Sequence, residues 1–159
     1  MGDFLMKSRE YPERPLIGVG VVVLGAENVL MIQRSKPPRV GGWSLPGGAQ
    51  KLGEKVYEAA IREVREETNI DVEVMGLIDV VDSIHRDKVG VVQYHYTLVD
   101  VLARSLGGVL AAGDDAVDAE WVATQDIAGM ELWSETKRII QLAIEMAEVI
   151  PDWNLCPEK

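Results

Sequence analysis

Cysteine is almost missing from this chain of 159 residues, which has only Cys156 near its C-terminus. A single thiol cannot form a disulfide within the chain, so a small disulfide-stabilised fold is excluded and a reducing compartment is favoured. The chain also lacks an apolar run of about 18 residues, the length that spans a membrane, and residues 1–15 lack the apolar core of a signal peptide. We therefore expect a cytoplasmic protein that does not insert into a membrane.

Basic residues are also scarce. The chain has 16 Lys and Arg against 26 Asp and Glu, which gives a formal net charge of −10. Nonspecific binding to nucleic acid needs a basic surface, so we expect no nucleic-acid partner; a homodimer stays open. Hydrophobic residues make up 47% of the chain and charged residues 26%, the composition of an ordinary globular protein.

Apolar runs separated by turn residues predict strands and two helices. A Val-rich run at 16–24 is typical of a strand buried on both faces, and a long alternating segment follows later in the chain. The predicted strands are 16–24, 29–34, 43–45, 72–82, 91–102 and 119–123, and the second helix has its N-cap at Ser134 and ends at about 149. This order predicts an α/β fold, in which a mixed β-sheet lies between helices.

The segments between these elements are predicted as loops and turns. We expect a turn at Pro46-Gly47-Gly48 and loops at 35–42, 83–90 and 103–118, where Gly, Pro and polar residues gather. Pro12 and Pro15 predict an N-terminal arm over residues 1–15. We expect one domain over residues 16–150, followed by a C-terminal tail at 151–159.

The first predicted helix carries three carboxylates on one face. Glu63, Glu66 and Glu67 stand at positions i, i+3 and i+4, which share a helical face. Like charges at this spacing repel one another, and a hard divalent cation such as Mg²⁺ or Mn²⁺ would remove the conflict because it prefers oxygen ligands. Arg62 stands beside them and could orient one carboxylate. The alternative is an exposed acidic face with no ligand.

The segment around these acids resembles the signature of the Nudix hydrolases. The positions that match the pattern are Gly48, Glu54, Arg62, Glu63, Val64, Glu66, Glu67 and Ile70. One position departs, because Asn69 stands where the family has glycine. A helix commonly ends there in a left-handed residue, and Asn tolerates that conformation best after Gly. We expect this change to leave the chemistry unaffected.

The resemblance implies an α/β/α sandwich over about residues 16–144 and hydrolysis of a diphosphate linkage with Mg²⁺ or Mn²⁺. It implies that Glu63, Glu66 and Glu67 bind the metal together with the carbonyl of Gly48, while Glu63 is also a candidate base. Glu54 is expected to pair with Arg62, or else to be a plain first-turn carboxylate. The substrate-binding role falls on Arg34, Gly47 and Gly48, with a surface position as the alternative for Arg34.

An acid outside the signature is a further candidate in such enzymes. Asp114 and Asp115 follow Gly113 in a predicted loop, where turn chemistry is the alternative role. We favour Asp115 as the catalytic helper and expect Glu120 to point outward from its strand. The two histidines are expected to be bystanders, His85 exposed in a loop and His95 packed on a strand. Trp43, Tyr94, Tyr96 and Trp133 are candidates to stack on a base, although core packing explains any one of them.

Three stretches outside the signature resemble the bacterial ADP-ribose pyrophosphatase-like branch of the family: GGWSLPGG, QYHYTLVDVLA and GGVLAAGDDAVDAEWV. This resemblance implies a nucleoside diphosphate derivative as substrate, with ADP-ribose first. A nucleoside triphosphate pyrophosphohydrolase, including one that acts on oxidised nucleotides, is the alternative enzyme. A non-catalytic nucleotide-binding module is the alternative outside enzymes, and it is disfavoured because such modules typically lose the carboxylates that this chain keeps.

Overall fold

The computed structural model describes residues 9–113 and 115–153. Within this part of the chain, a mixed sheet of seven strands packs against two α-helices. The strands are β1 Leu16–Leu24, β2 Asn28–Arg34, β3 Trp43–Ser44, β4 Gly47–Ala49, β5 Asp71–Arg86, β6 Val92–Gly107 and β7 Ala116–Ala123; the helices are α1 Val56–Thr68, η1 Thr124–Gly129 (a 3-10 helix) and α2 Ser134–Val149. The predicted α/β class with a mixed sheet between helices is confirmed.

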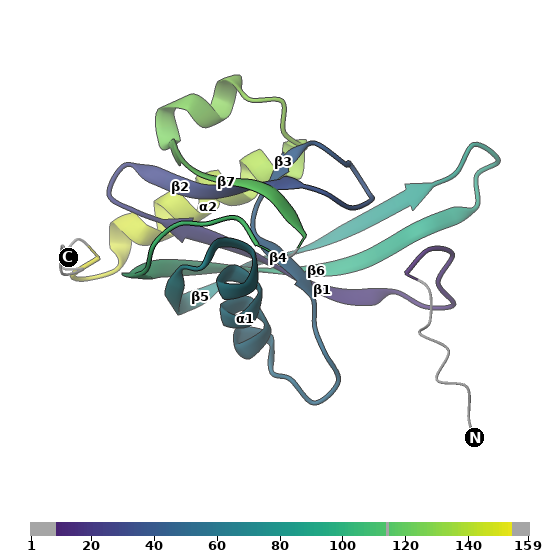
Figure 1. Cartoon of the computed structure of the whole chain (residues 1–159), viewed down its shortest axis with the longest axis horizontal. Coiled ribbons are helices and arrows are strands. Elements are labelled where there is room, and N and C mark those ends of the chain that lie inside the picture. The colour runs from purple at the N-terminus through teal and green to yellow at the C-terminus, as the bar shows by residue number, and fades with distance from the viewer. Residues whose placement is uncertain (1–8, 114, 154–159) are drawn as a thin grey trace.

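The sheet has the order β3-β2-β1-β6-β5, and β4 and β7 pair with β1 and β2 respectively. The β1–β6 pair is parallel and the other pairs are antiparallel. Figure 1 shows α1 and α2 on opposite faces of this sheet. Successive residues of a strand point to opposite faces, so Val21 and Val23 pack in the core beneath α1 while Val22 and Leu24 pack in the core beneath α2. The unbroken apolar run of β1 follows from this burial on both faces.

The helix α1 has well-defined ends. At its start, the backbone N–H of Lys55 donates a hydrogen bond to Glu58 Oε2 at 2.9 Å, as in a capping box. At its end, Asn69 adopts a left-handed conformation with φ 60° and ψ 18°. The Asn69 side chain also donates from Nδ2 to the carbonyl of Val109 at 2.9 Å. The expectation that Asn69 closes the helix in the left-handed region is therefore confirmed.

The longest departure from the sequence-based prediction lies in β5 and β6. Residues 83–86, predicted as the start of a loop, continue β5, and β6 extends to Gly107 rather than ending at 102. Together the two strands form a hairpin that projects from the body of the molecule (Figure 1). Pairing across the hairpin, such as Ile84 opposite His95, explains the difference. The partner strand forms hydrogen bonds with the backbone of this segment. Its polar side chains alone predict a loop.

Other element ends also shift. The predicted turn at Pro46-Gly47-Gly48 is partly the strand β4, because Gly47–Ala49 pairs with β1. The strand β7 begins at Ala116, inside the predicted loop 103–118. Ser134 is the first residue of α2 rather than its N-cap, which is Trp133. No helix within the described residues is long and apolar enough to cross a bilayer.

The described part of the predicted arm contacts the β5–β6 hairpin. The backbone N–H of Tyr11 donates to the carbonyl of Gln93 at 2.8 Å, and the Tyr11 hydroxyl donates to Asp87 at 3.0 Å. These contacts join residues that are far apart in sequence. They place the arm beside the hairpin rather than along the core.

Candidate active site

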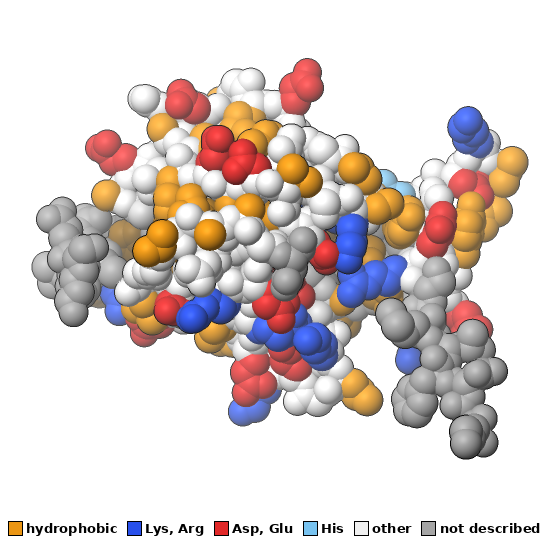
Figure 2. All heavy atoms as spheres, in the orientation of Figure 1, with side chains coloured by type: hydrophobic (Ala, Val, Ile, Leu, Met, Phe, Trp, Pro, Cys, Tyr) orange, Lys and Arg blue, Asp and Glu red, His pale blue; other side chains and the backbone are white. Residues whose placement is uncertain are grey.

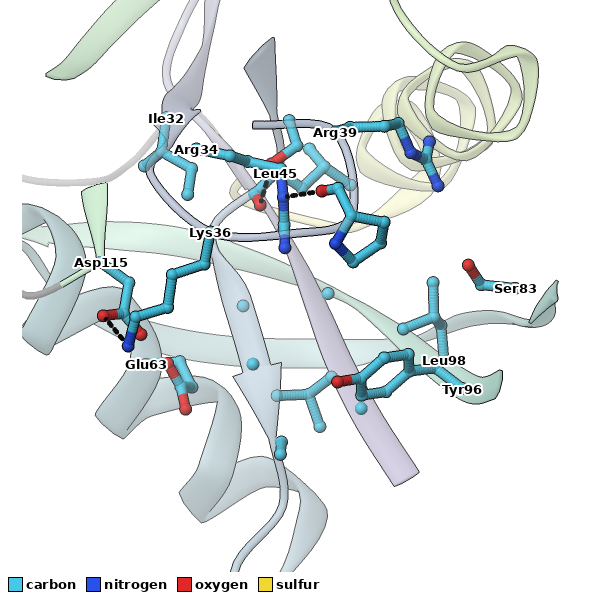
Figure 3. A pocket seen from close by; sticks show the side chains of 18 of the residues that line it. Ile32, Arg34, Lys36, Arg39, Leu45, Glu63, Ser83, Tyr96, Leu98 and Asp115 are labelled. Atoms are coloured by element: carbon cyan, nitrogen blue, oxygen red, sulfur yellow. Dashed lines mark hydrogen bonds and ion pairs between the residues drawn. The ribbon is translucent and has the colours of Figure 1, made fainter. Parts of the chain in front are cut away.

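A cleft of about 800 Å³ runs from the acidic face of α1 across β4, β1 and β6 to the beginning of α2. The loop 35–42 forms its opposite wall. Figure 3 shows Arg34, Lys36 and Arg39 on that wall, Glu63 at one end and Tyr96 with Leu98 on the sheet side. All the predicted site residues line this cleft: Arg34, Gly47, Gly48, Arg62, Glu63, Glu66, Glu67 and Asp115.

Arg62 is the centre of the ion pairs at the α1 end. It binds Glu54 with two nitrogen atoms, at 2.5 and 3.0 Å, and its Nη1 reaches Glu63 at 2.7 Å and Glu66 at 3.1 Å. Its Nη2 also donates to the carbonyl of Ala49 at 3.1 Å. The expected Glu54–Arg62 pair is thereby confirmed. These contacts hold the pKa of Glu54 down to about 2, chiefly through Arg62.

Glu67 is the most buried acid of the helix, with 5% of its surface exposed. Its Oε2 accepts a hydrogen bond from the backbone N–H of Gly47 at 3.1 Å. Burial and, to a smaller extent, the charge of Glu63 raise the pKa of Glu67 to about 8, against the opposing effect of the Gly47 hydrogen bond. Burial likewise raises the pKa of Glu63, although Arg62 opposes this. A positive charge bound between these two carboxylates would therefore stabilise their ionised forms.

Gly47 and Gly48 let the backbone of β4 approach this site. A Cβ on Gly48 would lie 2.5 Å from the carboxylate of Glu63, and a Cβ on Gly47 would lie 2.0 Å from the carbonyl oxygen of Val19. Any side chain at either position would displace its neighbours. The glycine pair is thus explained by close approach of the backbone.

The donor set fits a hard divalent cation. Glu63, Glu66 and Glu67 offer carboxylate oxygens beside the backbone of Gly48, and oxygen ligands suit Mg²⁺ and Mn²⁺. Among residues 9–113 and 115–153, no three acidic, His or Cys side chains are already arranged as a metal-binding group. Arg62 contacts only Oε1 of Glu63 and Oε2 of Glu66, so its contacts leave the second oxygen of each carboxylate for a metal.

Positive side chains face the acidic helix from the opposite wall. Arg34 is held by hydrogen bonds from Nε to the carbonyl of Pro38 at 2.9 Å and from Nη2 to that of Pro37 at 3.5 Å. Lys36 pairs with Asp115 at 2.5 Å. Figure 2 shows basic and acidic side chains gathered side by side on this face of the molecule. The charges of Arg34 and Asp115 both act on the pKa of Glu67, so these residues lie near the acidic helix.

Trp133, at the start of α2, marks an aromatic end of the cleft. The other predicted stacking candidates, Trp43, Tyr94 and Tyr96, line the cleft as well. The guanidinium of Arg39 lies 4.4 Å from the ring centroid of Trp133, a cation–π contact. Arg39 also lies 3.2 Å from Nε2 of His85. The prediction of His85 as an exposed loop residue is wrong, because β5 carries it half-buried against the loop 35–42.

Lys36, Arg39 and Asp100 are among the cleft residues that the sequence did not indicate as site candidates. Lys36 and Arg39 belong to the loop 35–42, where the only available indication was a basic residue beside prolines. Asp100 is the single acid within the apolar run of β6. An isolated acid in such a run was the available sequence signal for a site residue. Glu120 is exposed on β7, as expected. Asp114 lies outside the described residues.

The comparison with known proteins agrees with this geometry. The NUDIX domain family matches residues 14–143. The ADP-ribose pyrophosphatase of Methanocaldococcus jannaschii is 38% identical over 107 residues, covering 67% of this chain and 61% of that protein. The 8-oxo-dGDP phosphatase NUDT18 of Danio rerio is 35% identical over 108 residues, covering 65% of this chain and 30% of that protein. The chain thus spans less than two thirds of the length of these relatives.

Solved structures share the fold. A MutT NUDIX hydrolase from Burkholderia pseudomallei has a TM-score of 0.69 and 29% identity, covering 82% of this chain and 98% of that chain. The NUDIX domain of Shewanella oneidensis NrtR, determined with ADP ribose, has a TM-score of 0.68 and 24% identity, covering 84% of this chain and 89% of that chain. Because the family match extends over most of its length, this chain belongs to the NUDIX domain family.

Proposed function

We propose that this protein hydrolyses the diphosphate linkage of a nucleoside diphosphate derivative in a metal-dependent reaction. One observation carries the proposal: a single cleft joins the acidic face of α1, a wall of basic side chains and an aromatic end. A diphosphate is anionic and resists attack by water, so its cleavage needs positive charge and a positioned nucleophile. An aromatic end suits the base of a nucleotide.

Glu63, Glu66 and Glu67 are the proposed ligands of Mg²⁺ or Mn²⁺, together with the carbonyl of Gly48. When bound, the ion would neutralise phosphate oxygens and lower the pKa of a water. Arg62 positions Glu63 and Glu66 before the ion arrives, since its guanidinium contacts both. The amide of Gly47 orients Glu67 by its hydrogen bond.

Arg34 is the proposed phosphate-binding residue. Two backbone carbonyls fix its guanidinium on the cleft wall, and the planar fork of arginine suits phosphate oxygens. Asp115 is the proposed helper that accepts a proton from the attacking water. Its ion pair with Lys36 holds the carboxylate beside the cleft, and a base must lie within reach of the attacking water.

ADP-ribose is the proposed substrate. The proposal is supported by the 38% identity to an ADP-ribose pyrophosphatase and by the cleft volume of about 800 Å³, which offers room for groups on both sides of a diphosphate. An oxidised nucleotide is the second candidate, because a relative that is 35% identical is an 8-oxo-dGDP phosphatase. Specificity between the two depends on contacts at the aromatic end rather than on the acidic helix.

A substrate panel tests the proposal. The purified protein is incubated with Mg²⁺ and, separately, ADP-ribose, a nucleotide sugar, 8-oxo-dGDP or a nucleoside triphosphate, and the products are separated by chromatography. We expect AMP and ribose 5-phosphate from ADP-ribose, with the highest kcat/KM in the panel. A preference for 8-oxo-dGDP would support the second candidate. Binding of ADP-ribose without cleavage of any compound would support the non-catalytic module instead.

A further inference from the structure

Asp100 is a buried acid that the proposed chemistry leaves unused. It lies on β6, with 5% of its surface exposed, and it lines the cleft. Its Cα pairs with that of Gly20 on β1, and a Cβ on Gly20 would lie 2.0 Å from Asp100 Oδ1. The missing side chain of Gly20 therefore makes the space that the carboxylate occupies.

The carboxylate of Asp100 has no hydrogen-bond or ion-pair partner among the described residues. The neighbouring acids Asp79 and Glu135 do have a partner, because Arg138 binds Asp79 at 2.9 Å and Glu135 at 2.7 Å. Within the same residues, every side-chain nitrogen or oxygen that is sealed from solvent has a partner. The oxygen atoms of Asp100 are therefore not sealed, and they face the cleft that the residue lines.

Asp100 belongs to the end of the cleft on the α2 side of the sheet, because Leu98 and Leu102, two residues away on β6, pack in the core beneath α2. The charges that act on it come from Asp79, Arg138 and Glu135. The first turn of α2 contributes Glu135 and Thr136 to the same lining, beside Trp133. A nucleotide with its diphosphate at α1 would place its nucleoside at this end.

A buried carboxylate without a partner is costly unless a ligand supplies one. From this geometry we infer that Asp100 is a specificity-determining residue that accepts a hydrogen bond from the nucleoside of the substrate. A carboxylate only accepts hydrogen bonds, so the group it binds is a donor. A ribose offers hydroxyl donors and adenine offers an exocyclic amine. The inference rests on the proposed function, since it assigns a nucleoside to this end of the cleft.

Binding of a ligand that cannot be cleaved tests this role separately from hydrolysis. The probe is adenosine 5′-(α,β-methylene)diphosphate, whose bridging carbon resists cleavage, and binding is measured by calorimetry with Mg²⁺. Two analogues distinguish the donors: the 2′,3′-dideoxy compound lacks the hydroxyls, and the inosine compound lacks the amine. We expect the wild-type protein to bind one of these analogues at least about tenfold more weakly than the parent.

Asp100→Ala removes both acceptor oxygens, so it should weaken binding of the parent by at least about tenfold and remove the preference over that analogue. Asp82→Ala is the matched control, because Asp82 is exposed on β5 and does not line the cleft; it should bind like wild type. The inference is overturned if wild type does not bind the parent, if it binds all three compounds equally, or if Asp100→Ala keeps the preference. A failure to hydrolyse ADP-ribose would leave these binding results unaffected.

Discussion

Arg62 binds the carboxylate of Glu54 through two nitrogen atoms, with Nε 2.5 Å from Oε1 and Nη2 3.0 Å from Oε2. The same guanidinium reaches Glu63 and Glu66. Glu54 precedes α1, so this pair ties the loop before the helix to its acidic face. One side chain thereby connects the loop with two of the proposed metal ligands.

Arg62→Lys should reduce kcat/KM on the order of 10–100-fold, the usual effect of removing a group that orients metal ligands. Lysine keeps the charge but cannot hold Glu54 bidentately while contacting Glu63. The apparent affinity for Mg²⁺ should fall in parallel, as measured by activity over a metal titration. Arg65→Lys is the control, because Arg65 pairs with Asp71 in an exposed position on the same helix. Equal activities of both variants would contradict this role of Arg62.

Asp115→Asn should lower kcat by about a hundredfold with a smaller effect on KM, the pattern of a group that acts in the transition state. The ion pair with Lys36 offers a sharp control. If Asp115 served only to hold Lys36, Lys36→Met would reproduce the loss. We expect Lys36→Met to raise KM instead, since it removes a cation from the cleft wall. Steady-state kinetics of both variants, with Glu120→Gln as an exposed control, decides between these roles.

The helix end at Asn69 yields a stability prediction. Asn69→Val should lower the free energy of unfolding by about 1–2 kcal/mol or more, because a β-branched residue is strained in the left-handed region. Asn69→Gly should stay within about 1 kcal/mol of wild type, since easier backbone geometry is offset by loss of the hydrogen bond to Val109. Urea unfolding of the two variants measures the difference. Equal midpoints for Asn69→Val and wild type would show that the conformation of Asn69 is unimportant.

Asp100 predicts a pH dependence of stability. Burial, followed by the charge of Asp79, raises its pKa to about 6 in the folded protein, against the opposing charge of Arg138; the usual value near 3.9 applies when the chain is unfolded. Between these values the folded protein binds more protons, so the contribution of Asp100 becomes less favourable as pH rises through 6.

Asp100→Asn removes this titration. Its melting temperature relative to wild type should therefore increase from pH 4 to pH 7, by an amount equivalent to about 1–3 kcal/mol. Thermal unfolding in a pH series without ligand measures how the difference in melting temperature changes with pH. Any cost of burying the asparagine amide is the same at every pH, so it does not affect this change. Asp82→Asn, an exposed change on the same sheet, should show no such slope. If the difference in melting temperature between Asp100→Asn and wild type were the same at every pH, the raised pKa assigned to buried Asp100 would be wrong.

The acidic helix was predictable from sequence because its information is local. The spacing of Glu63, Glu66 and Glu67 sets one face of a helix, and Asn69 marks the end of that helix. The fold class followed equally from the order of apolar segments. In contrast, three of the four residues 83–86 of β5 are polar, and pairing with β6 makes this segment a strand.

The wall opposite the helix could not be predicted in the same way. Arg39 meets Trp133 and His85 through contacts between segments that are distant in sequence. The carboxylate of Asp100 occupies the space left by the missing side chain of Gly20, its neighbour on β1. Sequence patterns report the faces of single elements. They do not report which side chains meet across a cleft.

The central claim is metal-dependent hydrolysis directed by the acidic face of α1. Its most direct test is the rate of AMP release from ADP-ribose by protein freed of metal with EDTA, before and after addition of excess Mg²⁺. We predict no turnover before addition, full turnover after it, and at least about a hundredfold loss of kcat in Glu67→Gln, while the exposed change Glu73→Gln leaves kcat unaltered. Undiminished turnover in EDTA, or wild-type kcat in Glu67→Gln, would contradict the account.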